Sequence, residues 1–249
     1  MPWLSAFDDL LRSAREAAGV GPRIAAVEID DPVMGRFRGP DAIAEYTIKG
    51  RTWTRDHQAV ATEVATTISA QRTVGEYEVE VSTDGREAII PVAAVAEATP
   101  SLTRLRVYLS LWVLSGTHLP RLPILDEDPV CRASGIVGRY LDALGAGDVA
   151  GCIACYEPDG CLQGGGGPTF ARCGTPNLKA AYTEHLARGG IVLRPCTVTE
   201  DGVRTGFEFA LVRWGDVELA PQAGLAVYER GPSGLIARAR VYDDASRPF

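Results

Sequence analysis

Two acidic residues lie in apolar surroundings that could give a carboxyl group acid–base chemistry. Glu208 stands in the run FEFALV (residues 207–212), and Asp31 follows an apolar stretch and precedes Pro32. An unpaired buried carboxylate costs several kcal/mol, so such a residue needs either a partner or a use. Burial also raises the pKa of a carboxyl group, which can then exchange a proton near neutral pH. Asp31 and Glu208 are therefore candidate general bases.

Both carboxylates also have an ordinary structural interpretation. Asp31 could be a solvated turn residue, because paired acids beside a proline are common in loops. A period of two puts Glu208 on the same strand face as Trp214. If that face lines a pocket, Glu208 is an acid or a base, and Glu208→Gln abolishes activity. If the face points outward, Glu208 forms a salt bridge, with Arg238 or Arg240 as partners.

Other polar and aromatic side chains could contact a molecule bound in such a pocket. His185 follows Tyr182 by three residues on a predicted helix, which puts both on one helix face. Gln222 could donate a neutral hydrogen bond. The candidate substrate-binding residues are Tyr46, Trp112, Tyr182, His185, Trp214, Gln222 and Tyr228. No histidine pair and no Glu–His pair has the spacing of a helical metal site, so we expect no metal.

The six cysteines all lie in the second half of the chain. Cys152 and Cys155 form one C-x-x-C on a predicted helix, and a structural zinc site would need a second such pair. The spacing is not that of a small disulfide scaffold, so we interpret the cysteines as small buried side chains in a reducing cytoplasm. A redox or metal role is the alternative.

Composition and charge restrict the class of protein. The chain has 249 residues, of which 46% are hydrophobic and 23% charged, and its formal net charge is −7. This is an ordinary globular composition, and no apolar stretch approaches the roughly 20 residues of a membrane helix. An acidic chain is a poor partner for polyanions. We therefore expect neither nucleic acid nor a membrane as a partner.

The sequence contains two copies of one unit. The segment RLRVY (104–108) returns as RARVY (238–242), and GPDAIAEYT (39–47) returns as TPNLKAAYT (175–183). Weak matches at nearly one offset indicate a tandem duplication. A stretch rich in proline and acidic residues separates the copies. We expect a first unit at residues 1–119, a linker at 120–130 and a second unit at 131–249.

Each unit opens with helices and continues with strands. The first has predicted helices at residues 3–14 and from Pro40, and strands at 24–29, 74–82, 87–96 and 102–113. The second has predicted helices at residues 136–144, from Asp148 and from Thr175, and strands at 161–163, 206–214, 218–229 and 235–242. Helices followed by a run of antiparallel strands are typical of an α+β fold with the helices on one face of the sheet.

Three segments of the second unit carry a family resemblance: RYLDALGAGDV (139–149), YEPDG (156–160) and GLIARARVYD (234–243). They resemble the opening helix, the turn before the first strand and the closing strand of the nuclear-transport-factor-two-like superfamily, specifically its SnoaL-like and ketosteroid-isomerase-like members. The first unit matches more weakly, through FRGPDAI (37–43) and its closing strand. The resemblance implies two cone-shaped α+β barrel units in tandem, each a curved antiparallel sheet wrapped round N-terminal helices. It also implies an apolar pocket in each cone and sheet-against-sheet packing of the two units.

The resemblance further implies roles for single residues. Ketosteroid isomerase uses an aspartate base, with a tyrosine and a protonated acid as its oxyanion hole. Tyr140 matches the oxyanion-hole tyrosine, whereas the base position falls at about Gly164 and the second acid at about Ala226. Asp31, followed by Pro32 and Val33, resembles the motif that carries the isomerase base. Tyr140 therefore joins the two carboxylates as a candidate catalytic residue.

These features predict a cofactor-independent enzyme that acts on an apolar, polyketide-like or terpenoid-like small molecule by acid–base proton transfer, as a cyclase or isomerase. An epoxide hydrolase or epoxide-opening cyclase is one alternative, because paired carboxylates could protonate an epoxide and activate water. A non-catalytic ligand-binding or scaffolding module is the other, favoured by the missing carboxylates at Gly164 and Ala226. We expect the two units to form a pseudo-dimer within the chain, with a further homodimer left open.

Overall fold

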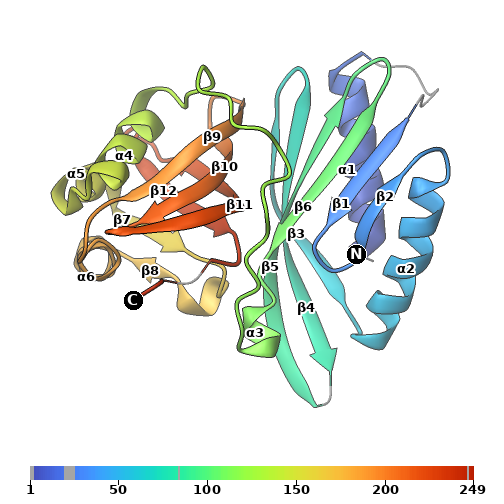
Figure 1. Cartoon of the computed structure of the whole chain (residues 1–249), viewed down its shortest axis with the longest axis horizontal. Coiled ribbons are helices and arrows are strands. Elements are labelled where there is room, and N and C mark those ends of the chain that lie inside the picture. Colours follow the sequence, from blue (N-terminus) through green and yellow to red (C-terminus); the bar gives the residue numbers. More distant parts are fainter. Residues whose placement is uncertain (1–2, 20–25, 84, 246) are drawn as a thin grey trace. The chain divides into compact units, whose positions relative to one another are not determined.

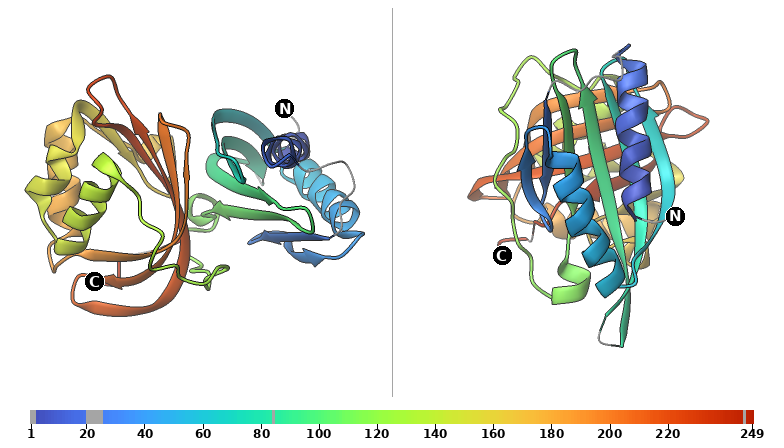
Figure 2. Two further views of the ribbon diagram at one scale, coloured as in Figure 1. Left: turned by 90° about the horizontal axis from the view of Figure 1, so that it is seen from above. Right: turned by 90° about the vertical axis from the view of Figure 1, so that its right-hand side faces the viewer.

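Two compact units make up the chain. The computed structural model describes residues 3–19, 26–83, 85–245 and 247–249. The chain divides into residues 1–116 and 117–249 (Figure 1). In each unit the long helices cover one face of a single sheet, as the views in Figure 2 show. The predicted α+β arrangement is therefore present twice.

The first unit contains three helices and six strands in its described residues. They are α1 (Trp3–Ala17), β1 (Val27–Asp31), β2 (Gly35–Arg38), α2 (Ala42–Asp56), β3 (Val60–Ile68), β4 (Arg72–Thr83), β5 (Arg86–Ala98), β6 (Thr103–Leu109) and α3 (Trp112–Ser115). The start of the predicted strand at 24–29 and Asp84 of the predicted Asp-Gly turn lie outside the described residues. The last predicted strand ends at Leu109, and Trp112 begins the short helix α3 instead.

The second unit repeats this order with two additional short helices. Its elements are α4 (Gly135–Ala146), α5 (Val149–Ala154), β7 (Tyr156–Gln163), the short helix η1 (Pro168–Phe170), β8 (Arg172–Cys173), α6 (Thr175–His185), β9 (Ile191–Glu200), β10 (Arg204–Trp214), β11 (Val217–Arg230) and β12 (Ile236–Tyr242). The predicted helices and the long strands of this unit are present, whereas β9, like β3 of the first unit, is not predicted by the sequence pattern.

The two sheets have the same strand order. It runs β2-β1-β6-β5-β4-β3 in one unit and β8-β7-β12-β11-β10-β9 in the other. The sheets are mixed rather than purely antiparallel, because β1 pairs parallel with β6 and β7 pairs parallel with β12. These partners are far apart in sequence, so no hairpin dictates their direction. Neither sheet closes into a barrel, since each ends in two edge strands.

The turn between α4 and α5 follows the sequence prediction. Gly147 ends α4 with φ 74°, in the left-handed region that glycine adopts without strain. Asp148 then caps α5 by accepting a hydrogen bond from the amide of Gly151 at 2.9 Å. This turn brings the rings of Tyr140, on α4, and Tyr156, at the start of β7, to 5.8 Å in an edge-to-face contact.

The segment predicted as a linker follows the sheet of the second unit. The carbonyl of Arg121 accepts from the amide of Ala223 at 2.7 Å, and the amide of Asp128 donates to the carbonyl of Pro195 at 2.8 Å. The side chain of Glu127 pairs with Arg194 at 3.0 Å. Residues 120–130 are therefore held by backbone and side-chain contacts to β9 and β11.

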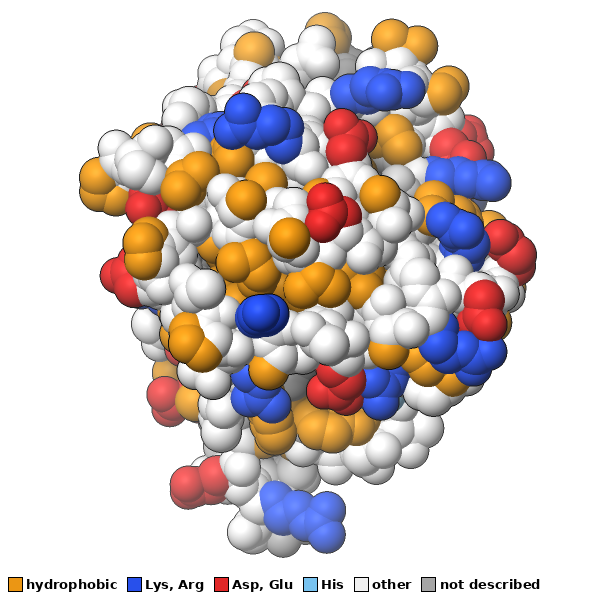
Figure 3. Space-filling view, turned by 90° about the vertical axis from the view of Figure 1, so that its left-hand side faces the viewer, with side chains coloured by type: hydrophobic (Ala, Val, Ile, Leu, Met, Phe, Trp, Pro, Cys, Tyr) orange, Lys and Arg blue, Asp and Glu red, His pale blue; other side chains and the backbone are white. Residues whose placement is uncertain are grey.

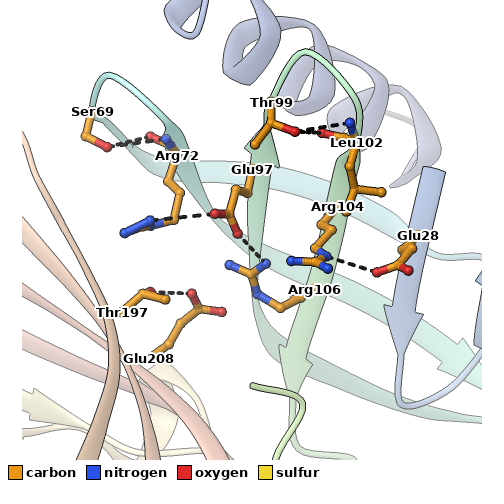
Figure 4. Close-up of polar contacts among 10 residues, drawn as sticks. All are labelled: Glu28, Ser69, Arg72, Glu97, Thr99, Leu102, Arg104, Arg106, Thr197 and Glu208. Carbon is orange, nitrogen blue, oxygen red and sulfur yellow. Dashed lines mark hydrogen bonds and ion pairs between the residues drawn. The ribbon is translucent and has the colours of Figure 1, made fainter. Parts of the chain in front are cut away.

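In the sheet of the first unit, a glutamate and an arginine are buried on the face opposite the helices. Glu76 on β4 and Arg106 on β6 are 0% and 3% exposed. Arg106 pairs with Glu97 at 2.9 Å, and Glu97 also lies 3.8 Å from Arg72 (Figure 4). A buried charge is tolerated when it is paired and hydrogen-bonded, as Arg106 is here.

The corresponding sheet face of the second unit has the same residue types. Glu208 on β10 and Arg240 on β12 are 1% and 5% exposed. Arg240 pairs with Glu229 at 3.1 Å, and Arg204 pairs with the same carboxylate at 3.2 Å. The duplication seen in the sequence therefore extends to the buried charges of each sheet.

A disulfide bond corrects the expectation that all six cysteines are small buried side chains. Cys161 on β7 and Cys173 on β8 are bonded, with their Cα atoms 4.1 Å apart. They face each other across the two-residue pairing of these strands. Disulfides persist in oxidising compartments, so this bond does not support the expected cytoplasmic location.

Reduction of this disulfide is expected to destabilise the second unit. The bond spans 12 residues of sequence, and a loop of roughly that length contributes about 3 kcal/mol by restricting the unfolded chain. Urea unfolding with and without a dithiol reductant measures the change. The double variant Cys161→Ser/Cys173→Ser should match the reduced wild type and ignore the reductant; a variant that still responds would contradict the assignment.

Among the described residues, no helix has the length and hydropathy of a transmembrane segment. Figure 3 shows one face of the molecule, on which basic and acidic side chains are interspersed and apolar side chains gather between them. No run of a single charge dominates the face drawn there.

Candidate functional site

The second unit encloses a ligand-sized cavity between its helices and the inner face of its sheet. The cavity has a volume of about 330 Å³, within the range of small-molecule sites. Its lining residues are Tyr140, Leu144, Leu162, Gly164, Gly165, Gly166, Phe170, Arg172, Tyr182, His185, Ile191, Leu193, Phe209, Leu211, Trp214, Ala226, Tyr228, Val241, Asp243 and Ala245. Most of this lining is apolar, so any chemistry at the site depends on its few polar groups.

Three buried tyrosines form one hydrogen-bonded network beside the cavity. The hydroxyl of Tyr182, on α6, lies 2.8 Å from that of Tyr140 and 2.7 Å from that of Tyr156. All three side chains are at most 4% exposed. Helices α4 and α6 supply two of the hydroxyls, and the first residue of β7 supplies the third.

All three tyrosines of the network remain protonated, and one hydroxyl proton is free to form a hydrogen bond with a ligand. Burial raises the pKa of Tyr140, Tyr156 and Tyr182 well above the usual value for a phenol, so all three stay protonated at neutral pH. Two hydrogen bonds use two of the three hydroxyl protons, and the third is available to a bound molecule. Tyr140 and Tyr182 both line the cavity. A donor that itself accepts a hydrogen bond is polarised and donates more strongly.

Asp243 brings a carboxyl group with a raised pKa into the same cavity. It directly follows β12, and burial raises its pKa to about 6, with the neighbouring charge of Asp244 adding to the shift. A hydrogen bond from the backbone of Ala245 works in the opposite direction. A carboxyl group with this pKa gains and loses a proton near neutral pH, as a general base or acid must.

The adjacent acid, Asp244, has a structural role on the other side of the strand end. Its carboxylate lies 3.0 Å from Nδ1 of His118 and accepts a hydrogen bond from the amide of Leu119 at 3.1 Å. Successive residues of an extended chain point to opposite sides, which explains why Asp243 lines the cavity and Asp244 does not.

Tyr228 connects the carboxyl group with the tyrosine network. Its ring lies 5.3 Å from that of Tyr140. Burial raises the pKa of Tyr228 well above its usual value, and the nearby carboxylate of Asp243 adds to that shift. Tyr228 therefore packs against Tyr140 and lies within electrostatic range of the candidate base.

His185 and Trp214 form a second pair on the cavity wall. Their rings meet edge-on at 5.8 Å, and Nε1 of Trp214 donates to the carbonyl of His185 at 2.9 Å. Burial lowers the pKa of His185, so its ring is neutral at neutral pH. Its Nδ1 is buried and makes no hydrogen bond within the described structure. The ring therefore has a polar atom to offer a ligand.

The structure brings together five of the ten residues named from sequence. Tyr140, Tyr182, His185, Trp214 and Tyr228 all line the cavity. Gly164 and Ala226 line it as well, so the two positions where the resemblance implies carboxylates lie in the cavity and carry none. Gln222, on β11, is not among the lining residues.

Glu208 lies on the opposite face of β10 from the cavity. Its neighbours Phe207 and Phe209 belong to the helix-covered core, and Glu208 accepts a hydrogen bond from Thr197 of β9 at 2.5 Å (Figure 4). Burial was correctly anticipated for this residue, and the cavity-facing orientation was not found.

A β-bulge explains why the side chains of Trp214 and Glu208 lie on opposite faces of β10. The register of β10 shifts between Leu211 and Arg213 against both neighbouring strands. A bulge moves every later side chain to the other face of the sheet. Trp214 therefore joins Phe209 on the cavity wall, although a period of two places it with Glu208.

Replacement of Glu208 tests this geometry directly. Because Glu208 points away from the cavity, we expect Glu208→Gln to keep any cavity-based proton-transfer rate within about threefold of wild type. We expect it to lower stability by about 1–3 kcal/mol through the loss of a charged hydrogen bond. Urea unfolding and a proton-exchange assay measure the two effects. Loss of activity in a fully folded Glu208→Gln protein would restore Glu208 to the mechanism.

In the first unit, Asp31 is buried and fully engaged by its own neighbours. One carboxylate oxygen accepts from the amides of Val33 and Met34 at 2.7 and 2.8 Å, and the other accepts from the hydroxyl of Tyr46 at 2.8 Å. Burial raises the pKa of Asp31, while these hydrogen bonds act against the shift. The cavity that Asp31 lines holds only about 10 Å³, roughly the room for one water molecule.

The described cavity beside Asp31 is therefore too small for a ligand. Tyr46 is committed to Asp31, and Trp112 is not among the residues that line the small cavity. A catalytic role for Asp31 remains a prediction, and its position favours the structural interpretation, in which it holds a turn and a tyrosine.

Asp243 is the residue that sequence reasoning missed. It is the last residue of the segment GLIARARVYD, which the family resemblance identifies as a closing strand. The available signal was its place at the end of that strand, next to a second aspartate. Two adjacent acids there resemble a solvated strand end, and only the packed structure separates the inward one from the outward one.

Comparison with known proteins gives similarity in fold. No family model and no curated protein matches the sequence. A protein of unknown function from Cytophaga hutchinsonii, described as NTF2-like, is 16% identical, with a TM-score of 0.36 over 44% of this chain and 87% of its own. A protein from Sinorhizobium meliloti, provisionally assigned as a polyketide cyclase, is 18% identical, with a TM-score of 0.37 over 44% of this chain and 94% of its own.

A third similar structure is a protein of unknown function with a cystatin-like fold from Methylobium petroleophilum. It is 17% identical, with a TM-score of 0.38 over 45% of this chain and 75% of its own. Each of these proteins matches less than half of this chain.

Proposed function

We propose that the second unit is a cofactor-independent enzyme that moves a proton on an apolar small molecule, in an isomerisation or an aldol-type cyclisation. The observation that carries this proposal is the pairing, in one largely apolar cavity of about 330 Å³, of Asp243 with a hydrogen-bonded tyrosine network. Asp243 supplies the base, and Tyr140 supplies the hydroxyl donor. The first unit has a structural role in this proposal.

The reaction begins with a carbonyl compound whose α-carbon faces Asp243. The carboxylate takes the α-proton, and the electron pair of the C–H bond forms a carbon–carbon double bond as charge develops on the carbonyl oxygen. Tyr140 donates a hydrogen bond to that oxygen and stabilises the developing charge. The tyrosines are placed before the reaction, so no reorganisation is needed as the charge appears.

The protonated Asp243 then completes either outcome. In an isomerisation it returns the proton to a different carbon of the conjugated system. In a cyclisation the enolate carbon attacks a second carbonyl carbon of the same molecule, and the resulting alkoxide takes the proton from Asp243. Both outcomes regenerate the carboxylate and need no oxidant, reductant or metal.

Of the alternatives, the epoxide-opening mechanism has weaker support in this geometry. It rests on two carboxylates, one to protonate the epoxide and one to activate water. Among the described residues that line the cavity, Asp243 is the single carboxylate. The non-catalytic binding module becomes the conclusion if the cavity binds ligands without exchanging their protons.

Exchange of α-protons for deuterium tests the proposal without knowledge of the natural substrate. We would incubate the protein with 2-tetralone, an apolar ketone with acidic α-protons, in D₂O and follow the loss of the α-proton signal by NMR. We expect exchange above the buffer rate in wild type, and saturation with increasing ketone. Binding of 2-tetralone with no exchange above buffer would overturn the catalytic proposal and leave a binding module.

A further inference from the structure

Arg172 is an exposed cation on the lining of the largely apolar cavity. It lies on β8, its side chain is exposed, and it is among the residues that line the cavity. Tyr140 and Tyr182, which line the same cavity, are buried. A ligand that fills the cavity would therefore meet the guanidinium group.

In the described structure Arg172 has no ion-pair partner. Six other arginines of the second unit are paired with acids: Arg188 with Asp216, Arg194 with Glu127, Arg204 and Arg240 with Glu229, Arg230 with Glu200, and Arg247 with Glu184. Arg132, Arg139, Arg213 and Arg238 resemble Arg172 in having no ion pair in the described structure, but they do not line the cavity. In a chain with a formal net charge of −7, acids that could pair with Arg172 are abundant. An arginine left without one beside a cavity is available to a ligand.

The backbone of β8, the strand that carries Arg172, is held by contacts to β7 and to α6. The disulfide between Cys161 and Cys173 lies at the adjacent position. The carbonyl of Cys173 accepts from the side chain of Asn177 at 2.8 Å, and the amide of Gly174 donates to the carbonyl of Gly160 at 2.9 Å. Alternation along β8 turns Cys173 away from the side to which Arg172 points. The backbone position from which the Arg172 side chain extends is therefore fixed before a ligand binds.

From this placement, and resting on the function proposed above for the cavity, we propose that the natural ligand carries a singly charged acidic group, such as a carboxylate, which Arg172 binds while the apolar body fills the cavity. A planar guanidinium matches a carboxylate through two parallel hydrogen bonds. A single arginine balances a single negative charge, which favours a carboxylate over a phosphate. The substrate class is then an apolar keto acid.

Two fluorescent probes that differ by one acidic group test this inference. 8-Anilinonaphthalene-1-sulfonate carries one negative charge, and N-phenyl-1-naphthylamine has the same aromatic skeleton without it. We expect wild type to bind the anionic probe more tightly, with one probe per chain, and the anionic probe to displace the neutral one. Added salt should weaken binding of the anionic probe alone, because salt screens exposed charges.

Arg172→Gln is expected to weaken binding of the anionic probe about tenfold and to leave the neutral probe within about twofold of wild type. Arg172→Lys should recover part of the loss, since it keeps the charge without the planar fork. Arg132→Gln is the matched control, because Arg132 is also an exposed arginine of the second unit but does not line this cavity. Arg172 is exposed, so its replacement should leave the fold intact.

Each outcome bears on the proposal. Unchanged binding of the anionic probe by Arg172→Gln, equal losses for both probes, the same loss in Arg132→Gln, or failure of either probe to bind wild type would overturn it. The probe experiment does not depend on catalysis. If Arg172 governs anion binding and 2-tetralone is not turned over, the anion site stands and the enzyme proposal fails. If 2-tetralone is turned over and Arg172 has no effect on the anionic probe, the reverse holds.

Discussion

Replacement of Asp243 by asparagine is expected to lower the rate of α-proton exchange by about 10²–10⁴-fold, the usual contribution of a positioned general base. Asparagine keeps the shape and polarity of the side chain but cannot accept the substrate proton. The measurement is the exchange of 2-tetralone in D₂O, compared at equal protein concentration. The loss should lie in kcat rather than in ketone affinity, since the substitution leaves the cavity volume nearly unchanged.

The pH dependence of the same reaction gives an independent check. The base must be ionised, and burial raises the pKa of Asp243 to about 6. In wild type, kcat/KM should therefore rise with pH, pass its midpoint near that value and level off above it. The residual exchange in Asp243→Asn should lack this step. A flat profile in wild type would exclude Asp243 as the base.

Stability should change with pH in the opposite sense. Because the folded state raises the pKa of Asp243, it binds the proton more tightly than the unfolded chain does. This contribution to stability is complete below the unfolded value of about 4 and is lost as the pH rises through about 6. Relative to wild type, Asp243→Asn should gain about 1–2 kcal/mol between these limits, a figure reduced for the partial exposure of the side chain.

Asp244→Asn is the matched control for this pair of experiments. The two aspartates are adjacent and chemically identical, but the carboxylate of Asp244 contacts His118 and the amide of Leu119 outside the cavity. We expect this variant to exchange protons within about threefold of wild type and to keep the pH midpoint. Equal losses in the two variants would point to a disturbed strand end rather than to a missing base.

Replacement of Tyr140 by phenylalanine is expected to slow proton exchange by about 10²–10³-fold, the effect of removing one oxyanion donor. The hydroxyl lies 2.8 Å from that of Tyr182, so its removal also breaks the network. Tyr182 lines the cavity too and can donate in its place, which sets the upper limit of the loss.

Binding of 2-naphthol separates this role from packing. A phenol resembles the enol formed in the reaction, and its oxygen can accept a hydrogen bond from the tyrosine network. We expect Tyr140→Phe to bind 2-naphthol about tenfold more weakly, a loss of one good hydrogen bond, and to bind naphthalene as wild type does. Equal affinity for 2-naphthol in variant and wild type would remove Tyr140 from the site.

Tyr77→Phe provides the control for loss of a buried tyrosine hydroxyl. Tyr77 lies in the core of the first unit and is 3% exposed. Burial raises its pKa as it does for the tyrosines of the network. The change of atoms is the same, and the distance from the cavity's chemistry is the only intended difference. We expect this variant to lose some stability and to retain both proton exchange and 2-naphthol binding.

The sequence by itself determined the repetition and much of the secondary structure. Matching segments such as RLRVY and RARVY lie at corresponding positions in β6 and β12. Local rules were sufficient for the helix caps, because Gly147 and Asp148 act within one turn of the chain. Tyr182 and His185 both line the cavity, as their shared helix face predicts, since helix geometry fixes the direction of neighbouring side chains.

Only the tertiary structure decided where the chemistry lies. A bulge in β10 moves Trp214 onto the cavity wall and leaves Glu208 on the other face. The parallel partnership of β7 and β12, and the disulfide that joins β7 to β8, connect residues that no short-range pattern relates. Register and pairing depend on which distant surfaces are buried together, and a shift of one residue reverses every side chain beyond it.

The same limit explains why two similar units differ in the space beside their buried carboxylates. In the first unit the carboxylate of Asp31 accepts hydrogen bonds from Tyr46 and from the backbone of a turn, and the adjoining cavity has a volume of about 10 Å³. In the second unit the core packs around a space of about 330 Å³, and Asp243 reaches it from the end of the last strand. Periodicity specifies which side chains point inward. Whether they fill the interior or leave room for a ligand depends on how their volumes fit together in three dimensions.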